Sequence, residues 1–251
     1  MRNRKLVLAV LVAAAFAGAA TTAAAQAAIS ATEIVRRVEA NERDASSVLL
    51  FEMTVREAGG REPRLYRIRL RSRGDEESMV EFLEPRTIRG LRVLSLGDES
   101  WVFFPSTGRT RKISGASRSG SVQGVGGDFS YEDLASDTWS KDYAFSIAGE
   151  DGQTWTLEGK AAKVGSTYDA IRMTIEKATF RSLRIEYSSA AKGFFKALAF
   201  SDFKPMGGKT RASAMEMRNV TLGSRTSLTL VEAAYDQPID DRWFSPERFS
   251  K

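Results

Sequence analysis

Hydrophobic and polar residues alternate along most of this chain, so that nearly every second side chain is apolar. Over residues 46–56, Leu49, Phe51, Met53 and Val55 alternate with mostly polar neighbours. Successive side chains of a strand point to opposite faces of its sheet, so these four residues would share one face. The pattern therefore predicts a strand with one apolar face at this position.

Runs of the same kind follow at the spacing of β-hairpins and give about a dozen strands with almost no helix. They lie at residues 64–73, 79–83, 91–96, 101–104, 109–113, 143–148, 154–158, 168–177, 183–187, 194–203, 212–220 and 227–233. Pairs such as Gly97-Asp98 and Gly207-Gly208 are typical of the tight turns that join antiparallel neighbours. A meander of this kind curls into a barrel or a large curved sheet. The pattern predicts a single, mostly β domain.

One helix is predicted before the first strand. Ser30 and Glu33 have the spacing of a capping box, in which each side chain bonds a free backbone N–H of the first turn. Ile34, Val35 and Val38 then form a short apolar stripe with the helical period. We expect this helix over residues 31–43.

Residues 114–127 interrupt the alternation with five glycines, several serines and no apolar period, which predicts a long mobile loop. The acidic residues that follow, together with Phe129, Tyr131 and Leu134, predict a short amphipathic helix with Asp128 as its N-cap. We interpret Asp128, Phe129, Tyr131 and Leu134 as a lid. The alternative is a surface loop that merely crosses the sheet.

The first residues have the pattern of a secretory signal peptide. Arg2, Arg4 and Lys5 precede an apolar run over residues 6–20, and small residues with the Ala-x-Ala spacing follow. The run is too short to span a membrane, which takes about 18 apolar residues. We predict a signal peptide over residues 1–25, with cleavage after residue 25 or 27, and a mature chain without a transmembrane segment, located in the periplasm.

Cleavage of this leader removes three positive charges and lowers the net charge from +5 to +2. The basic character of the chain is therefore largely a property of the leader. A nucleic acid is not expected as a partner.

Composition excludes several kinds of active site. The chain has no His and no Cys, so it has no Ser-His-Asp triad, thiol nucleophile or disulfide. The Ser-x-x-Lys pattern at 189–192 matches the nucleophile motif of penicillin-recognising enzymes, but the companion motifs are missing. Neighbouring carboxylates such as Glu76-Glu77 would point to opposite faces of a strand. We predict no catalytic residues, no metal, no cofactor, and a protein that is not an enzyme.

A row of arginines occupies one face of the predicted strand at 64–73: Arg67, Arg69, Arg71 and Arg73. Such a row could meet phosphate groups or an acidic partner. It could equally be the solvated face of a half-buried sheet, paired across to residues such as Glu52 or Glu81.

The apolar faces carry many large, flat or flexible side chains. Eight strands nearly fill a barrel with their own side chains, whereas about eleven or more leave room for a ligand. Methionines and aromatics suit a cavity that accepts variable acyl chains, although an ordinary core has a similar composition. The residues predicted to line the cavity are Phe51, Met53, Tyr66, Ile68, Phe82, Trp101, Phe103, Trp155, Met173, Met215 and Met217.

Several motifs resemble the outer-membrane lipoprotein-sorting proteins, the LolA-like periplasmic carriers. The most specific is Gly-Asp-Phe-Ser-Tyr-Glu-Asp-Leu at 127–134. Trp-Val-Phe-Phe-Pro at 101–105, Arg-x-Arg-Lys-Ile at 109–113 and Phe-Leu-Glu-Pro at 82–85 fit the same pattern. The resemblance covers most of the mature chain, residues 26–251. It differs from the usual pattern in two loops, before Gly127 and near residue 190.

The resemblance implies an unclosed antiparallel β-barrel wrapped around a few short helices, with an apolar cavity for acyl chains. It implies a monomeric periplasmic carrier of lipid or lipoprotein acyl chains, with an inner-membrane exporter of the ABC or RND type as a partner. The alternative is an envelope accessory protein that docks on a transporter or an outer-membrane assembly and fills its cavity with its own side chains.

Overall fold

The computed structural model describes residues 29–134, 138–163 and 166–251. The predicted signal peptide lies outside these residues. The helices are α1 (Ala31–Glu42) and α2 (Trp139–Asp142), with short 3-10 turns η1 (Gly115–Ser119), η2 (Glu132–Leu134) and η3 (Asp241–Phe244). The strands are β1 (Ser46–Arg56), β2 (Arg64–Arg73), β3 (Glu77–Glu84), β4 (Arg92–Leu96), β5 (Glu99–Phe104), β6 (Arg109–Ile113), β7 (Tyr143–Glu150), β8 (Thr154–Ala161), β9 (Ala170–Glu176), β10 (Ser182–Ser189), β11 (Gly193–Met206), β12 (Lys209–Asn219) and β13 (Ser224–Tyr235).

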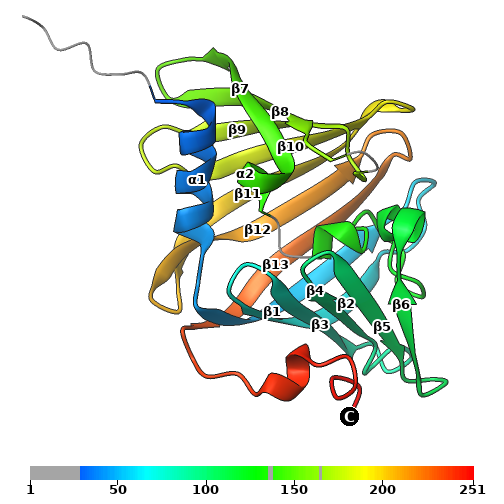
Figure 1. Cartoon of the computed structure of the whole chain (residues 1–251). Coiled ribbons are helices and arrows are strands. Elements are labelled where there is room, and N and C mark those ends of the chain that lie inside the picture. The colour runs from blue at the N-terminus through cyan, green and yellow to red at the C-terminus, as the bar shows by residue number, and fades with distance from the viewer. Residues whose placement is uncertain (1–28, 135–137, 164–165) are drawn as a thin grey trace, which may run out of the picture.

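All thirteen strands form one antiparallel sheet, in the order β6-β5-β4-β3-β2-β1-β13-β12-β11-β10-β9-β8-β7. The sheet curves strongly but stays open, because β6 and β7 are its two edges (Figure 1). The prediction of a mostly β, unclosed antiparallel fold is confirmed. The first and last strands pair at the centre of the sheet, with Met53 opposite Leu228.

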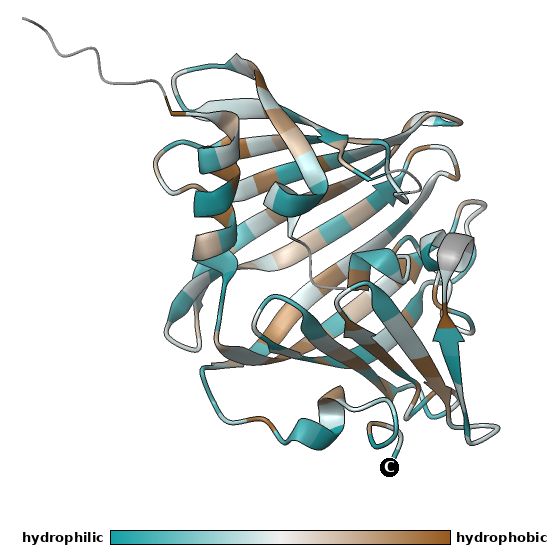
Figure 2. Cartoon of the chain, in the orientation of Figure 1, coloured by the Kyte–Doolittle hydropathy of each residue, from teal (hydrophilic) through white to brown (hydrophobic). Residues whose placement is uncertain are grey.

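The inner face of the sheet, defined here as the face toward α1, carries the main hydrophobic core. Apolar residues alternate with polar ones along the strands that form it (Figure 2). The α1 side chains of Ile34, Val35 and Val38 are fully buried against this core. The helix begins where the sequence predicts, since the Ser30 hydroxyl accepts a hydrogen bond from the Glu33 N–H at 3.2 Å.

The outer face of β3–β5 carries a second, smaller core, which the C-terminal segment covers. Phe244 and Phe249 of that segment pack with Met79 and Leu94, and Trp101 and Phe103 lie beside them. On β5 it is Val102, fully buried, that points to the inner core. The prediction that Trp101 and Phe103 line an inner cavity is therefore wrong, because β5 is apolar on both faces.

The arginine row of β2 lies on the outer face, and Arg71 and Arg73 of this row are paired within the protein. Arg71 makes a largely buried ion pair with Glu81 at 3.1 Å and lies 4.1 Å from the Trp243 ring. Arg73 bonds Glu77 and Asp241. For Arg71 and Arg73, the structure favours internal pairing over a binding surface for phosphate.

Among the described residues, none of the helices is both long enough and apolar enough to cross a membrane.

Candidate functional site: an amphipathic cavity

A cavity of about 540 Å³ opens on the inner face of the sheet. It lies between β1–β3 and β11–β13 on one side and the C-terminal end of α1, α2 and residues 127–134 on the other. Its volume falls within the range of roughly 300–1,000 Å³ that is usual for small-molecule sites. The site is therefore large enough to enclose a substantial part of an apolar ligand.

The deeper wall of this cavity is apolar. It combines inward-facing side chains of six strands with two side chains of residues 127–134. These are Leu49, Phe51, Ile68, Leu70, Val80, Leu198, Phe200, Met215, Leu228 and Leu230, with Phe129 and Leu134.

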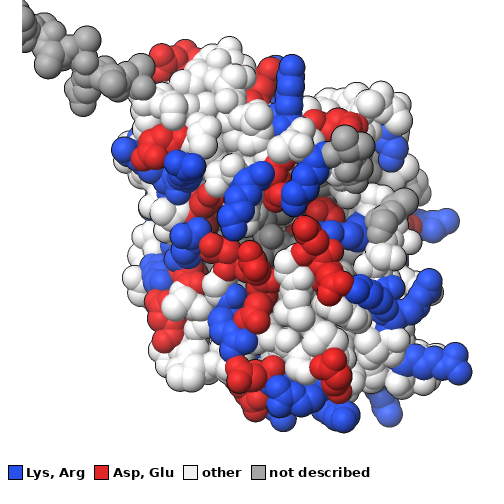
Figure 3. All heavy atoms as spheres, in the orientation of Figure 1, with Lys and Arg blue, Asp and Glu red and all other residues white. Residues whose placement is uncertain are grey.

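Part of the remaining lining is polar and charged, and we call this part the rim. Figure 3 shows acidic and basic side chains gathered around a hollow on this face of the molecule. The rim residues with charged or amide side chains are Glu39, Asn41, Glu42, Arg43, Asp44, Asp75, Arg181 and Arg211. The cavity is thus amphipathic, with an apolar wall and a charged rim.

The structure distributes the predicted cavity residues in three ways. Phe51, Ile68 and Met215 line the cavity. Met53, Tyr66, Phe82, Trp155, Met173 and Met217 belong to the same inner core but pack away from the cavity. Trp101 and Phe103 lie on the outer face. The period of two identifies a face of a strand, but not which part of that face borders empty space.

Sequence reasoning missed several lining residues, above all Leu198, Phe200, Leu228 and Leu230. Each lies on a strand that the alternation predicts. Leu230 lies opposite Phe51 because β1 pairs with β13. The sequence around either strand does not indicate how two strands so far apart in the chain pair.

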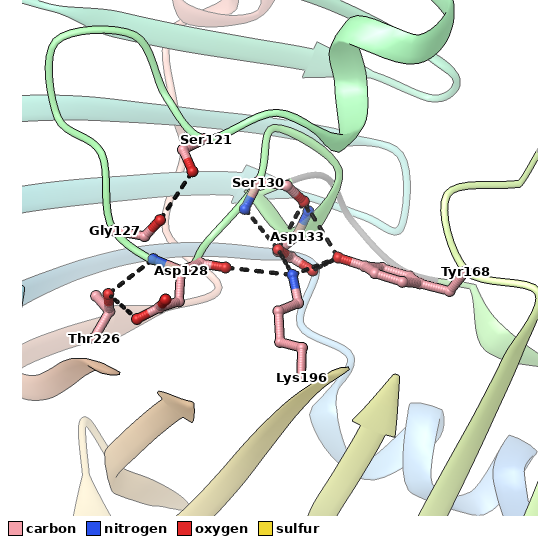
Figure 4. Close-up of polar contacts among 8 residues, drawn as sticks. All are labelled: Ser121, Gly127, Asp128, Ser130, Asp133, Tyr168, Lys196 and Thr226. Carbon is pink, nitrogen blue, oxygen red and sulfur yellow. Dashed lines mark hydrogen bonds and ion pairs between the residues drawn. The ribbon is translucent and has the colours of Figure 1, made fainter. Parts of the chain in front are cut away.

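Residues 127–134, here called the anchor segment, are fastened to the sheet by polar contacts (Figure 4). The Asp128 carboxylate accepts hydrogen bonds from the hydroxyls of Ser224 and Thr226 on β13, the latter at 2.9 Å. The Asp128 N–H donates to the Thr226 hydroxyl, also at 2.9 Å. Burial raises the pKa of Asp128 above its ordinary value, and these hydroxyl donors oppose that effect.

The prediction that Asp128 caps the short helix is wrong, because its side chain is committed to β13. Ser130 fills that role instead: its hydroxyl accepts the Asp133 N–H at 3.3 Å. The Asp133 carboxylate in turn accepts the Ser130 N–H at 2.6 Å. The turn that follows is the single 3-10 turn η2, rather than an amphipathic helix.

A buried ion pair fixes the other end of the anchor segment. The Lys196 ammonium lies 2.6 Å from the Asp133 carboxylate, and both side chains are about 95% buried, at 4% and 5% exposed. Tyr168 donates its hydroxyl proton to Asp133 at 2.7 Å and accepts a hydrogen bond from Lys196 (Figure 4). Burial raises the pKa of Tyr168, so the phenol stays protonated and remains a donor.

The preceding loop packs into the core with two of its side chains. Val122 and Val125 are 3% and 1% exposed, and the Tyr66 hydroxyl donates to the Val125 carbonyl at 3.1 Å. The Tyr131 hydroxyl accepts the Gln123 N–H at 2.9 Å. Tyr131 therefore holds the loop instead of facing the cavity, and residues 114–127, predicted as a long mobile loop, pack two valines into the core.

Neither the rim nor the anchor segment, as far as the structure describes them, has the set of ligand side chains that a metal centre needs. Across residues 29–134, 138–163 and 166–251, no cluster of three or more acidic, His or Cys side chains could hold a metal ion.

Comparisons with known proteins match the chain to one family model and to several solved structures. A family model described only as "-like: Uncharacterized protein" matches residues 74–251. The fold is similar to the putative outer membrane lipoprotein-sorting protein domain from Vibrio parahaemolyticus, with 26% identity, a TM-score of 0.77 and coverage of 88% of this chain and 98% of that one. No curated protein matches the chain in sequence.

Two further solved structures share the fold at lower identity. A LolA superfamily protein from Nitrosomonas europaea is 22% identical, with a TM-score of 0.73 over 87% of this chain and 98% of that one. A DUF1329 family protein from Desulfovibrio piger is 22% identical, with a TM-score of 0.77 over 85% of this chain and 95% of that one.

Proposed function

The chain belongs to the family of uncharacterized proteins matched over residues 74–251, and its fold is similar to that of an outer membrane lipoprotein-sorting domain; we propose that it is a non-enzymatic carrier of acyl chains. The cargo would be a lipid or the acylated end of a lipoprotein. The carrier would work in the periplasm, between an inner-membrane exporter of the ABC or RND type and the outer membrane.

The amphipathic cavity is the observation that carries this proposal. Each methylene that leaves water contributes about 0.8 kcal/mol, so an acyl chain needs an enclosed apolar surface to cross an aqueous space. The apolar wall offers such a surface, and the charged rim leaves a place for a polar headgroup. A cavity filled by the protein's own side chains would not leave about 540 Å³ of space.

Residues 127–134 would act as the movable wall of the carrier. Phe129 and Leu134 form one side of the cavity, and the segment that bears them is attached by the Asp128 and Asp133 contacts instead of by sheet pairing. We propose that cargo enters and leaves when this segment shifts. The segment would then act as a lid, held closed by the Asp128 and Asp133 contacts instead of by a capped helix.

The proposal is tested by purifying the mature protein from periplasm without detergent and identifying extracted lipid by mass spectrometry. A carrier should contain bound lipid near one molecule per protein. The variant Leu230→Glu places a carboxylate in the apolar wall and should lose this lipid while remaining folded. The matched control Val231→Glu changes the adjacent, exposed residue of the same strand and should keep it.

The second candidate function is an envelope accessory protein that docks on a transporter or an outer-membrane assembly. It predicts that the wild-type protein yields no lipid and that Leu230→Glu leaves its pull-down partners unchanged. Bound lipid that is lost only in Leu230→Glu would exclude it.

A further inference from the structure

Two charged side chains of the rim have no partner of opposite charge at ion-pair distance. Glu42 is the last residue of α1, and Arg181 follows the turn between β9 and β10. Both border the cavity. Within the described part of the chain, Glu42 receives no hydrogen bond and Arg181 contacts no carboxylate; the Arg181 guanidinium lies 5.1 Å from the Phe203 ring.

The other charges of the rim are compensated by the protein. Arg43 pairs with Asp75 at 2.7 Å, and Arg211 pairs with Asp44 at 2.9 Å. The Glu39 carboxylate accepts the N–H and the hydroxyl of Ser140, each at 2.7 Å. A headgroup that reaches the rim therefore meets one carboxylate and one guanidinium that form no ion pair within the described part of the chain.

These two groups belong to neighbouring parts of the molecule. The side-chain amide of Asn41 donates to the carbonyls of Thr179 and Phe180, at 2.7 and 3.4 Å. Asn41 precedes Glu42, and Phe180 precedes Arg181, so this contact holds the two charges on adjoining segments.

The surroundings of Glu42 favour a cation. It stands at the C-terminal end of α1, where the helix dipole is negative, and the last turn contains no basic residue. Glu42 is exposed along the rim, and desolvation by the protein around its carboxylate raises the pKa of Glu42 to about 7. Arg211 lowers that pKa, while Glu39 and Asp44 raise it.

We infer that the rim binds the headgroup of a phospholipid that carries a primary amine, with the ammonium at Glu42 and the phosphate at Arg181. This inference rests on the proposed function, because it assumes that the acyl chain lies in the apolar wall. An amine satisfies the carboxylate, and a phosphate matches the planar guanidinium donors. A fatty acid or an anionic lipid without an amine would leave Glu42 without a counter-charge.

The experiment measures binding of lysophospholipids that differ only in headgroup, by displacement of a fluorescent fatty acid from the delipidated mature protein at pH 8. Lysophosphatidylethanolamine is expected to bind about tenfold more tightly than lysophosphatidylglycerol, as one charge-assisted hydrogen bond would give. Glu42→Gln should remove this preference and leave lysophosphatidylglycerol binding unreduced. Arg181→Gln should weaken both ligands by about tenfold.

Matched controls change equally charged residues outside the cavity. Glu33→Gln alters the same helix, where Glu33 pairs with Arg37, and Arg172→Gln alters β9, where Arg172 pairs with Glu158. Neither control should change any affinity by more than about twofold. A long-chain alkylamine with the same chain has the ammonium without the phosphate, and it should bind about tenfold more weakly than lysophosphatidylethanolamine.

Equal affinity of the wild type for both lysophospholipids would overturn the inference, as would an equal loss of both in Glu42→Gln. Alkylamine binding as tight as lysophosphatidylethanolamine would refute the role of Arg181. If palmitate binds but headgroups are not distinguished, the headgroup inference alone fails. If no acyl ligand binds, the proposed function fails with it.

Discussion

Replacing Lys196 tests whether the buried ion pair holds the anchor segment. In Lys196→Met the Asp133 carboxylate stays about 95% buried without its cation, and the ammonium's contacts with the Asp128 carbonyl and the Tyr168 hydroxyl are lost. Breaking one side of a buried pair costs about 3–5 kcal/mol. For a chain of this size, each 1 kcal/mol corresponds to about 2–4 °C, so Tm should fall by roughly 6–20 °C.

The assay is urea unfolding of the wild type, Lys196→Met, Asp133→Asn and the double variant. Because the double variant contains neither charge, it should be destabilised by at least about 1 kcal/mol less than the sum of the single variants. Lys112→Met is the matched control, since Lys112 pairs with Glu99 at an exposed site and should cost at most about 1 kcal/mol. Additive single effects, or a loss below about 1 kcal/mol in Lys196→Met, would refute this account of the anchor segment.

Three further predictions concern a close approach, the two faces of the sheet and one titrating group. Gly127→Ala should lower the free energy of unfolding in urea by about 1–3 kcal/mol, since the new Cβ would lie 2.9 Å from the Thr226 hydroxyl. The control Gly59→Ala, also at positive φ but in open space, should lower it clearly less. Trp101→Ala should lower Tm without changing the dissociation constant for palmitate more than about twofold, while Leu230→Glu should abolish binding; equal loss in both would contradict the assignment of faces. The pKa of Glu42 is higher in the folded state than its ordinary 4.5, so its contribution to stability is present below pH 4.5 and is lost as pH rises through about 7. Glu42→Gln should therefore gain stability relative to the wild type between pH 4.5 and pH 8, and a constant difference would exclude this shift.

Local patterns predicted the elements because the signals for them are local. The Ser30 cap and the stripe of Ile34, Val35 and Val38 lie within three turns of helix, and the structure contains that helix at Ala31–Glu42. The alternation around Phe51 and Ile68 identified the correct faces of β1 and β2 because their other faces are mostly polar.

The same rule failed where the two faces of a strand are equally apolar. On β5 the second apolar face, with Trp101 and Phe103, is covered by a segment about 140 residues later in the chain. The role of Asp128 was missed for a similar reason, since its partners Ser224 and Thr226 are almost 100 residues away. Capping is decided by nearby residues only when no distant partner competes for the side chain.

The position of the cavity depends on how distant strands meet. Its apolar wall is completed where β13 pairs with β1 on one side and with β12 on the other. Its rim is completed where α1 approaches the turn after β9. Neither contact has a signature in local sequence. The lining residues on β11–β13 could therefore be predicted as buried, but not as neighbours of an open space.

The central pairing of β1 with β13 also constrains the order in which the molecule can assemble. β1–β6 and β7–β12 are two meanders of hairpins, and each can form from local contacts as soon as its residues are available. Only the twelve-residue strand β13, synthesised after both, joins them edge to edge. Until then the wall around Phe51 has no opposite side, so a nascent or partly translocated chain has no cavity to fill. The cavity therefore forms in one step, when β13 pairs with both meanders.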